Sequence, residues 1–441
     1  MESYVTDDII YALATGWVKS ALAVIRISGE GCIDALASRF SRPEALRQAP
    51  SSTLVHGLLV SEKKEEIDEV VVGVYRGTHG YTGEEALEIS CHGSLVGLKK
   101  ILGLCNGLGF RPAAGGEFTY RAFLHGRMDL TQSEAVAELI DSQSDVSQSL
   151  ALKRLNGALK NRLLALREQF LTVMATIEVQ LDYSEDEVEE FTFPTKALQE
   201  IADSMQKIAS TYQVGKLYGE GAKIVLAGST NVGKSSLFNL LLRQQRSIVS
   251  PLAGTTRDYI QETCVIEGIP VRLFDTAGLR ESQDEVEEEG VRRTRALIKE
   301  ADLVVYLLDE GEQPPPCDKK TLIVTSKSDI RQSSGQTGLC ISSVTGEGVE
   351  LLLKTIGDHL KENLPSVDDQ EVVIQSLRQH DLLINSEKAI ESALALQNQG
   401  VPLDIIASVL QDGLQSLGEI TGAVTAEDIL QKIFSNFCVG K

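Results

Sequence analysis

Residues 228–235 have the residue types and the spacing of a phosphate-binding loop. They read Gly-Ser-Thr-Asn-Val-Gly-Lys-Ser and fit G-x-x-x-x-G-K-[ST] without a mismatch. Glycines let backbone N–H groups approach phosphate oxygens, and a helix that begins here adds the favourable dipole of its N-terminus. Lys234 supplies a cation for the phosphates, and Ser235 supplies a hydroxyl for Mg²⁺. The residues that we expect to contact the nucleotide here are Asn231, Val232, Gly233, Lys234, Ser235 and Ser236.

Two further segments extend this site along the chain. Residues 275–278, Asp-Thr-Ala-Gly, follow an apolar run and supply an aspartate for the Mg²⁺ shell and a glycine N–H for the γ-phosphate. Residues 254–258, Gly-Thr-Thr-Arg-Asp, lie where a switch loop with a Mg²⁺-binding threonine belongs. Three elements in this order predict a nucleoside triphosphatase. From the second of them we expect nucleotide contacts by Asp275, Thr276, Ala277 and Gly278.

A third loop indicates guanine as the base. Residues 325–329, Thr-Ser-Lys-Ser-Asp, resemble the guanine motif N-K-x-D, with Ser326 in place of the asparagine. Asp329 can accept hydrogen bonds from the N1–H and the 2-amino group of guanine, which adenine does not offer. We expect Ser326 to lower the affinity, because a shorter side chain loses a hydrogen bond between loops. Lys327 and Ser342 are the other expected contacts near the base.

The position after D-x-x-G excludes the hydrolysis pattern of Ras-like GTPases. In those proteins a glutamine at this position orients the attacking water, which Leu279 cannot do. Hydrolysis therefore needs another carboxylate or amide, another cation, or a partner. Carboxylates follow downstream, and most of them are expected to belong to a solvated loop: Glu281, Asp284, Glu285, Glu287, Glu288 and Glu289.

Composition and charge narrow the class of protein. The 441 residues carry a formal charge of −21, which disfavours nucleic-acid binding over the whole surface. A basic run at 153–167 could still bind it locally, and an ordinary solvated helix face is the alternative. The seven cysteines contain no C-x-x-C pair, which indicates neither a zinc site nor a disulfide framework. No apolar run reaches the length of about 18 residues that a membrane helix needs. Because residues 1–10 also lack the basic start of a signal peptide, we expect a soluble cytoplasmic protein.

Residues 1–123 have the pattern of a small α+β domain. Short apolar runs that are typical of strands alternate with helical periodicity and glycine turns. We expect strands at 21–27, 70–75 and 86–90, and helices near 31–40 and 94–105.

Long helices are expected after this domain. Thr131 and Glu134 form a T-x-x-E capping box, and apolar residues then recur mostly at steps of three and four up to residue 181. This stretch is too long for one ordinary helix, so we expect at least two. An acidic run at 185–190 and another helix to about Tyr212 follow, and residues beyond 370 again have a helical pattern.

Residues 222–363 alternate strand, loop and helix, as in a doubly wound α/β domain. The strands are expected at 224–227, 271–274, 303–308, 322–325 and 339–342, all apolar runs typical of buried parallel strands. Since helical segments flank this region on both sides, we expect a P-loop GTPase domain inserted into an all-α domain built from two chain segments. The domain ranges that we expect are 1–123, 124–215, 216–365 and 366–441.

Motifs along the whole chain resemble those of the MnmE (TrmE) family of tRNA-modification GTPases, in the TrmE-Era-EngA-YihA-Septin-like superfamily. In the GTPase region they are Asn231, G-T-T-R-D at 254–258, D-T-A-G-L-R at 275–280 and D-E-V-E at 284–287. In the N-terminal region they are R-I-S-G at 26–29, T-G-E at 82–84, H-G at 92–93 and G-E-F-T-x-R-A-F at 116–123. The last five residues, Phe-Cys-Val-Gly-Lys, are similar to the F-C-x-G-K ending of that family.

The resemblance implies an activity and its partners. Family members act with the flavin-dependent protein MnmG on tRNA. They place an aminomethyl or carboxymethylaminomethyl group on C5 of the wobble uridine, with a 5-formyl- or methylene-tetrahydrofolate as the one-carbon source. They are homodimers through their N-terminal domains. Their GTPase domains pair face to face in a K⁺-dependent manner, without an arginine finger.

The resemblance also implies roles for single residues. Asn231, Ser250, Leu252 and Thr255 would surround K⁺, and Ser235 and Thr256 would hold Mg²⁺. Glu287 would orient the catalytic water indirectly, and Cys438 matches a cysteine that the modification needs. The expected folate-binding residues of the N-terminal domain and the chain end are Arg26, Glu88, Arg127 and Lys441.

The chain departs from the family pattern next to the expected folate site. The family's P-P-G-R-G-G-V-G is replaced by Gly-Trp-Val-Lys-Ser-Ala-Leu-Ala at 16–23. An Era/Der-like ribosome-assembly GTPase is the alternative function, but no G-x-x-G loop of a KH-type RNA module is evident in 367–441. A regulatory scaffold with weak GTPase activity is a further alternative.

Overall fold

A computed structural model gives the structure of the protein. It describes residues 6–182, 192–245, 260–275, 296–309, 312, 320–329, 339–362, 364–365, 371–425, 427–435 and 437–440. The chain divides into two compact units. The first comprises residues 1–137, 154–171 and 414–441, and the second comprises 138–153 and 172–413.

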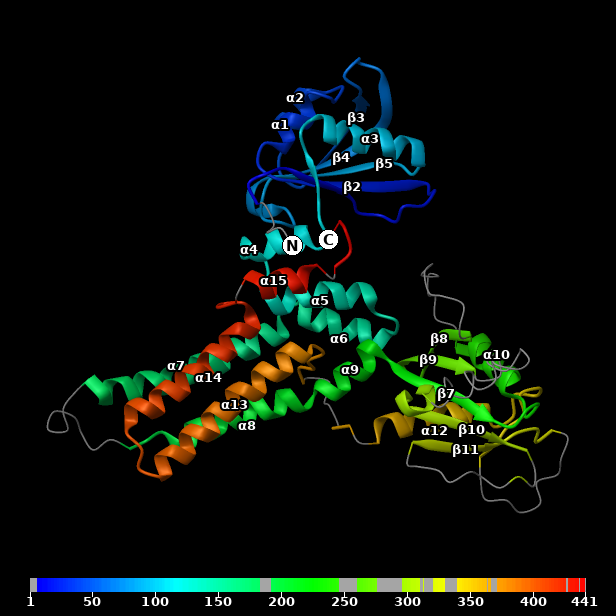
Figure 1. The fold of residues 1–441 in the computed structure, drawn as a ribbon. Coiled ribbons are helices and arrows are strands. Elements are labelled where there is room, and N and C mark those ends of the chain that lie inside the picture. Colours follow the sequence, from blue (N-terminus) through cyan, green and yellow to red (C-terminus); the bar gives the residue numbers. More distant parts are fainter. Residues whose placement is uncertain are drawn as a thin grey trace. The chain divides into compact units, whose positions relative to one another are not determined.

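The first unit contains a mixed sheet with the strand order β3-β4-β5-β2-β1-β6. Figure 1 labels β2, β3, β4 and β5 of this sheet. Its pairs are antiparallel except β1 with β6. The expected strands at 21–27, 70–75 and 86–90 are confirmed as β2, β4 and β5. The strand bounds are β1 (Ile10–Leu13), β2 (Leu22–Ser28), β3 (Thr53–Val60), β4 (Glu66–Tyr75), β5 (Ala86–His92) and β6 (Arg111–Pro112).

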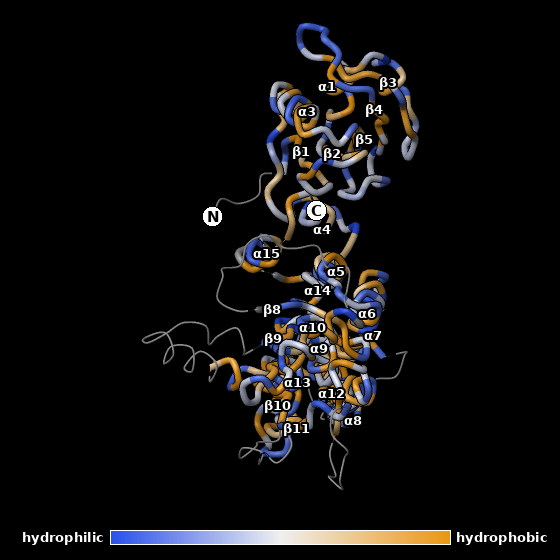
Figure 2. Tube along the Cα trace, turned by 90° about the vertical axis from the view of Figure 1, so that its right-hand side faces the viewer, coloured by the Kyte–Doolittle hydropathy of each residue, from blue (hydrophilic) through white to orange (hydrophobic). Residues whose placement is uncertain are grey.

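The two faces of this sheet are covered differently. Alternate residues such as Ile25, Val72 and Ile89 point into a core that also contains residues of the helices α1 (Cys32–Ala37), α2 (Pro43–Arg47) and α3 (Leu95–Gly107). The opposite face is covered near β1 by α4 (Glu117–Leu124), whose Phe118 packs on Ile10. Beyond α4 this face carries exposed apolar side chains, with Leu54 of β3 75% exposed. Hydrophobic residues, orange in Figure 2, lie along β3.

The first long helix begins earlier than the sequence predicts. α5 spans Leu130–Asp141, so Thr131 lies inside its first turn and the expected Thr131–Glu134 capping box is wrong. Asp129 takes the capping role, because its Oδ1 accepts a hydrogen bond from the Gln132 backbone N (2.9 Å). The Gln132 side chain in turn accepts one from the Asp129 backbone N (3.2 Å). The capping box therefore exists, two residues upstream.

Helices make up the regions on either side of the α/β domain, as expected. Gly157, with φ of 87°, separates α6 from α7, in the left-handed conformation that glycine adopts most readily. Arg154 is only 2% exposed, so the basic run at 153–167 is not solvated throughout. The bounds are α6 (Asp145–Leu155), α7 (Ala158–Asp182), α8 (Thr195–Ser210), α9 (Tyr212–Glu220), α13 (Leu377–Asn398), α14 (Leu403–Thr421) and α15 (Glu427–Phe434).

Helices from the two flanks of the α/β domain pack against each other. α8 precedes the domain and α13 follows it, and the two helices lie side by side (Figure 1). At their junction the Thr211 hydroxyl accepts a hydrogen bond from the Ile374 backbone N (3.1 Å). The expectation that the α/β domain is inserted between two halves of a helical region is thus confirmed.

The inserted domain is built on a second sheet, with the order β12-β11-β10-β7-β9-β8. All its pairs are parallel except β8 with β9, and β8 was not expected from the sequence. Apolar clusters cover both faces, as in a doubly wound fold. The bounds are β7 (Ala222–Gly228), β8 (Ile260–Ile266), β9 (Ile269–Asp275), β10 (Leu303–Leu308), β11 (Thr321–Thr325), β12 (Leu339–Cys340), α10 (Lys234–Gln245) and α12 (Val349–Lys361).

None of the helices within the described ranges combines the length and the apolar composition that a membrane crossing requires.

The close approach of α9 to the segment before α13 depends on a glycine. A Cβ atom on Gly215 of α9 would collide with the Ile374 carbonyl oxygen. We therefore expect Gly215→Ala to lower the free energy of unfolding by about 1–3 kcal/mol, because backbone atoms cannot give way as a side chain can. Chemical denaturation followed by circular dichroism measures this change.

Gly418 provides the control, since it lies inside α14 with nothing within 4 Å of an added Cβ. Gly418→Ala should leave stability unchanged or raise it by about 0.5–1 kcal/mol. Equal stability of the Gly215→Ala protein and the wild type would contradict this close approach of α9 to the segment before α13.

Candidate functional site

The phosphate-binding loop connects β7 to α10 with backbone angles that its sequence can adopt. Gly228 has φ of 139°, and a side chain there would collide with the Leu307 carbonyl oxygen on the neighbouring strand β10. Asn231 and Gly233 also have positive φ, 61° and 108°. Asparagine tolerates the left-handed region better than most residues, so this loop conformation suits its sequence.

Lys234 closes the loop on itself. Lys234 is buried, with an exposed fraction of only 7%. The ammonium group donates hydrogen bonds to the carbonyl oxygens of Ser229 (2.7 Å) and Gly228 (3.2 Å). It lies at the start of α10, where helix N–H groups and the helix dipole favour an anion. A buried cation at a helix N-terminus is the arrangement that binds phosphate.

Ser235 and Asp275 bring two oxygen ligands together. The Ser235 hydroxyl donates to Asp275 Oδ2 over 2.8 Å, and Asp275 is only 4% exposed at the end of β9. Since β7 and β9 are parallel neighbours, their carboxyl ends place these residues at the same edge of the sheet. Hydroxyl and carboxylate oxygens are the hard ligands that Mg²⁺ prefers, so this pair fits the expected metal.

Ser326 keeps the contact between loops that we expected it to lose. Its hydroxyl is buried and donates to the carbonyl oxygen of Val232, in the phosphate-binding loop, over 2.6 Å. The expectation of a lost bridging hydrogen bond is therefore wrong, because the two loops approach closely enough for a serine to reach. The base-recognising loop and the phosphate-binding loop are joined at this point.

The other residues that we expect to contact the base lie at the same edge of the sheet. Lys327 has φ of 66°, and its ammonium group forms an ion pair with Asp309 Oδ2 (3.0 Å). Asp329 is exposed, as a group that must meet a ligand would be. Ser342 is fully buried, and its hydroxyl accepts hydrogen bonds from the backbone N–H groups of Val344 and Thr345. Ser342 therefore shapes the last loop by binding the backbone of that loop with its side chain.

Several expected site residues lie outside the described residues, so the structure does not place them. They are Ser250, Leu252, Thr255, Thr256, Thr276, Ala277, Gly278, Glu287 and Lys441. What the structure brings together is the phosphate-binding loop from Gly228 to Ser236, Asp275 and the base-recognising loop.

The first unit brings Arg26 and Glu88 together on the less covered face of its sheet. The two residues are direct neighbours on β2 and β5, and Arg26 Nη2 lies 2.9 Å from Glu88 Oε1. The guanidinium lies 5.0 Å from the ring centre of Tyr81 and 5.7 Å from that of Phe118. Arg26 Nη1 also donates to the carbonyl oxygen of Gly440 (3.3 Å). Arg26 thus has partners from several segments at mid-strand. We call Arg26, Glu88 and Tyr81 the Arg26 site.

A charged network supports the segments around this site. Arg121 and Glu117 of α4 are fully buried, and Arg121 Nη2 lies 2.6 Å from Asp8 Oδ1. Arg111 bonds both Asp8 and Glu117, and Arg121 Nη1 lies 3.4 Å from Glu84 Oε2. Burial by itself raises the pKa of Asp8, but the hydrogen bonds and charges of Arg111 and Arg121 outweigh it and lower that pKa below its usual value. Two motifs quoted above, at 82–84 and 116–123, meet in this network.

The end of the chain reaches the same region. Val439 forms a β-bridge with Gly115, and the Gly116 backbone N donates to the carbonyl oxygen of Cys438 (3.3 Å). Cys438 itself is exposed. Arg127 is exposed too, and its side chain lies beside Gly83, where an added Cβ would come within 3.1 Å of it. The chain end and both candidate arginines therefore belong to one part of the first unit.

Two residues that contact the expected site residues, Tyr81 and Asp309, were not predicted from the sequence. Tyr81 faces Arg26, and its hydroxyl lies 2.9 Å from Thr119 Oγ1. Asp309 pairs with Lys327, although nothing marked it except its place directly after a buried strand. That place was a usable signal, because parallel strands gather their following residues at one edge.

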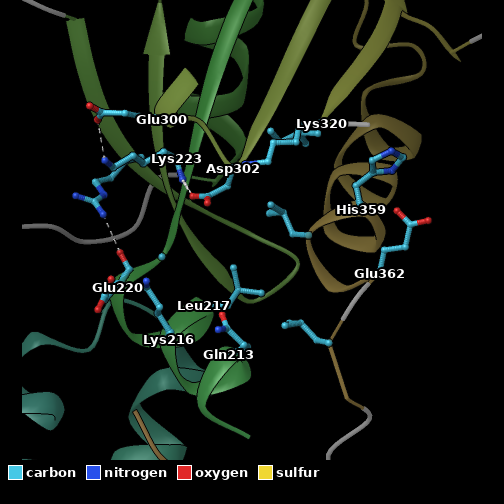
Figure 3. Close-up of a pocket in the computed structure, with 15 residues that line it drawn as sticks. Gln213, Lys216, Leu217, Glu220, Lys223, Glu300, Asp302, Lys320, His359 and Glu362 are labelled. Carbon is cyan, nitrogen blue, oxygen red and sulfur yellow. Dashed lines mark hydrogen bonds and ion pairs between the residues drawn. The ribbon is translucent and has the colours of Figure 1, made fainter. Parts of the chain in front are cut away.

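A cavity of about 680 Å³ lies among the amino-terminal ends of the parallel strands. Figure 3 shows it between Lys216 and Glu220 of α9 and the end of α12, which carries His359. Lys223 there pairs with Glu300 (3.4 Å). The nucleotide motifs lie after the carboxyl ends of the same strands, so this cavity is not part of the candidate nucleotide site.

Two family models match the chain. The model described as GTP-binding protein TrmE N-terminus matches residues 9–127, and the MnmE helical domain model matches residues 130–438. The second match extends over α13–α15, where an Era-like protein would carry its RNA-binding module. The Era/Der-like alternative is therefore not favoured.

Full-length relatives agree with the family models. The tRNA modification GTPase MnmE of Treponema denticola is 37% identical and aligns over 99% of this chain and 99% of its own length. That of Aquifex aeolicus is also 37% identical, over 98% of this chain and 99% of its own. A crystal structure of Aquifex aeolicus Era bound to GDP and AlF4⁻ is 27% identical and covers 38% of this chain and 66% of its own, with a TM-score of 0.26.

The Ser326 contact can be tested by removing its hydroxyl. Ser326→Ala leaves the buried Val232 carbonyl without this donor and loosens the two loops that must hold one nucleotide. We expect the affinity for GDP, measured by isothermal titration calorimetry, to fall about tenfold, which corresponds to about 1.4 kcal/mol.

Ser328→Ala is the matched control in the same loop. Its buried Oγ has no hydrogen-bond partner among the described residues, so removing it should leave the affinity unchanged. Equal affinities of the Ser326→Ala protein and the wild type would show that the bridging bond does not support nucleotide binding.

Proposed function

Because this chain belongs to the MnmE family of tRNA modification GTPases, we propose that it uses GTP hydrolysis in the modification of the tRNA wobble uridine. It adds a carboxymethylaminomethyl or aminomethyl group to C5 of that uridine, together with a flavin-dependent partner of the MnmG type. The observation that carries the proposal is the 37% identity over 99% of the chain to a relative named tRNA modification GTPase MnmE. We expect the protein to act in the cytoplasm.

The described residues fit Mg²⁺-bound GTP. Lys234 would hold the β and γ oxygens, and Ser235 and Asp275 would face the metal, with Thr256 as a further ligand. The metal, when bound, neutralises charge on the phosphates. Asp329 would select guanine by accepting hydrogen bonds that adenine cannot donate.

Asn231 supports the proposed dependence on K⁺. It is exposed and left-handed within the phosphate-binding loop, so its side-chain oxygen is accessible to a cation beside the phosphates. Ser250, Leu252 and Thr255 are the other proposed K⁺ ligands. The ion, when bound, supplies positive charge where other GTPases place an arginine. Glu287 would orient the water, in the role that Leu279 cannot take.

The Arg26 site supports a reduced folate as the one-carbon source. The half-buried ring of Tyr81 lies beside Arg26, as suits a flat heterocycle, and the partly exposed Glu88 carboxylate can accept hydrogen bonds from N–H groups. Arg127 and Lys441 would bind the glutamate carboxylates of the folate. Cys438 lies two residues before Gly440, which contacts Arg26, and this position supports a role for the thiol in the modification.

The open sheet face of the first unit supports a homodimer through the N-terminal domains. Leu54 of β3 and Leu22 of β2 are 75% and 66% exposed on the face that α1–α3 do not cover. A second copy packed on this face would bury both side chains. Pairing of the GTPase domains would be a separate, K⁺-dependent contact.

The function is tested by the tRNA of a strain that lacks this protein. Mass spectrometry of nucleosides from purified tRNA should show the loss of carboxymethylaminomethyl- and aminomethyl-type uridines. Restoring the full-length chain should restore them. Unchanged wobble uridines in the deletion strain would rule out the proposed function.

The cation dependence gives a separate prediction. GTP turnover should rise when K⁺ replaces Na⁺, and this rise should be absent in the Asn231→Ala protein. In KCl, kcat of the variant should therefore be about 10²-fold lower than that of the wild type. Steady-state phosphate release in matched KCl and NaCl measures both rates. Equal rates of the wild type in the two salts would reject the proposed K⁺ site. Retained GDP binding by the variant is the control for folding.

A further inference from the structure

The backbone and the side chain of Ser229 have different partners. Its carbonyl oxygen accepts a hydrogen bond from Lys234 Nζ (2.7 Å). Its hydroxyl lies 3.2 Å from Oε2 of Glu312 and donates to it. Ser229 therefore contacts the phosphate-binding lysine with one group and a residue from a different loop with the other.

Glu312 is joined to Asp309 by reciprocal hydrogen bonds. The same Oε2 atom accepts from the Asp309 backbone N (3.1 Å), and the Glu312 backbone N donates to the Asp309 carbonyl oxygen (3.2 Å). Asp309 directly follows β10, so the reciprocal bonds anchor Glu312 to the edge of the sheet. The Glu312 carboxylate thus reaches back to the backbone N three residues earlier, as the glutamate of a capping box does, while a backbone turn closes the other bond.

The contacts continue to the base-recognising loop. Asp309 Oδ2 lies 3.0 Å from Nζ of Lys327, and both side chains are about two-thirds buried or more, with 28% and 32% exposed. Ser229, Glu312, Asp309 and Lys327 thus form one series of contacts, which we call the polar link. It connects the lysine of the phosphate-binding loop to the lysine of the guanine motif.

We propose that Glu312 is a positioning residue for nucleotide binding, which holds the phosphate-binding loop and the base-recognising loop at the separation that one guanine nucleotide spans. The proposal rests on the nucleotide site alone and not on the modification of tRNA. Glu312 contacts Ser229 and Asp309, and through them it fixes Lys234 and Lys327.

The polar link complements the Ser326–Val232 hydrogen bond. That bond joins the two loops at Val232, and the polar link joins them at Ser229, three positions earlier in the phosphate-binding loop. One contact leaves a loop free to pivot, whereas two contacts fix its orientation. A ligand that bridges two loops binds more tightly when the loops are held in place beforehand, because less freedom is lost on binding.

Release of a fluorescent GDP analogue from the full-length protein, followed by stopped flow, tests the proposal. Ser229→Ala and Glu312→Ala should each speed release about threefold to tenfold, the range for a hydrogen bond to a partly solvated acceptor. The double variant should release no faster than the faster single variant, because both changes remove the same contact. Glu312→Gln keeps an acceptor oxygen and should recover most of the restraint.

Two controls separate positioning from general damage. Glu350→Ala removes an exposed carboxylate from α12 of the same domain and should release the analogue at the wild-type rate. Preference for GDP over XDP should stay the same in every variant, because Asp329 is untouched. Wild-type release from Ser229→Ala and Glu312→Ala, or effects that multiply in the double variant, would overturn the proposal.

Discussion

Parallel pairing of β7, β9, β10 and β11 is the constraint on which the nucleotide site depends. It places the residues that follow each strand at a single edge of the sheet. The phosphate-binding loop follows β7, Asp275 ends β9, Asp309 follows β10 and Ser326 follows β11. Chemistry that is spread over about a hundred residues of sequence is thereby gathered within hydrogen-bond distances, such as 2.8 Å between Ser235 and Asp275. Each loop then needs only short polar contacts to fix its place.

The first unit is organised by the need to satisfy buried charge. Arg121 and Glu117 lie where water cannot reach them, and a buried ion is tolerated only with partners around it. Asp8, Arg111 and Glu84 provide those partners from three other segments. The same segments carry Tyr81 and lead to Arg26 and to the chain end. A network that ties distant segments together therefore also sets the walls of the Arg26 site.

Most of the fold could be predicted from local patterns, whereas the contacts between loops could not. Apolar runs identified β2, β4, β5 and the parallel strands because these segments are buried. β3 was missed because residues such as His56 and Gly57 interrupt its pattern. β8, at the sheet edge, was missed because three consecutive polar residues, 261–263, break its apolar pattern. The Ser326 expectation failed for another reason: residue type gives the length of a side chain but not the distance between the loops that it joins. Likewise, neither Ser229 nor Glu312 belongs to a motif that would pair them.

The central claim is that the nucleotide site of this chain drives the modification of tRNA. It is tested most directly in the deletion strain, by supplying the full-length chain either unchanged or as Lys234→Ala. Lys234 is the buried cation of the phosphate-binding loop, and its loss removes nucleotide binding while the Arg26 site stays intact. Nucleoside mass spectrometry should find the modified wobble uridines restored by the unchanged chain and absent with Lys234→Ala. Full restoration by the Lys234→Ala protein, expressed at an equal level, would contradict the account.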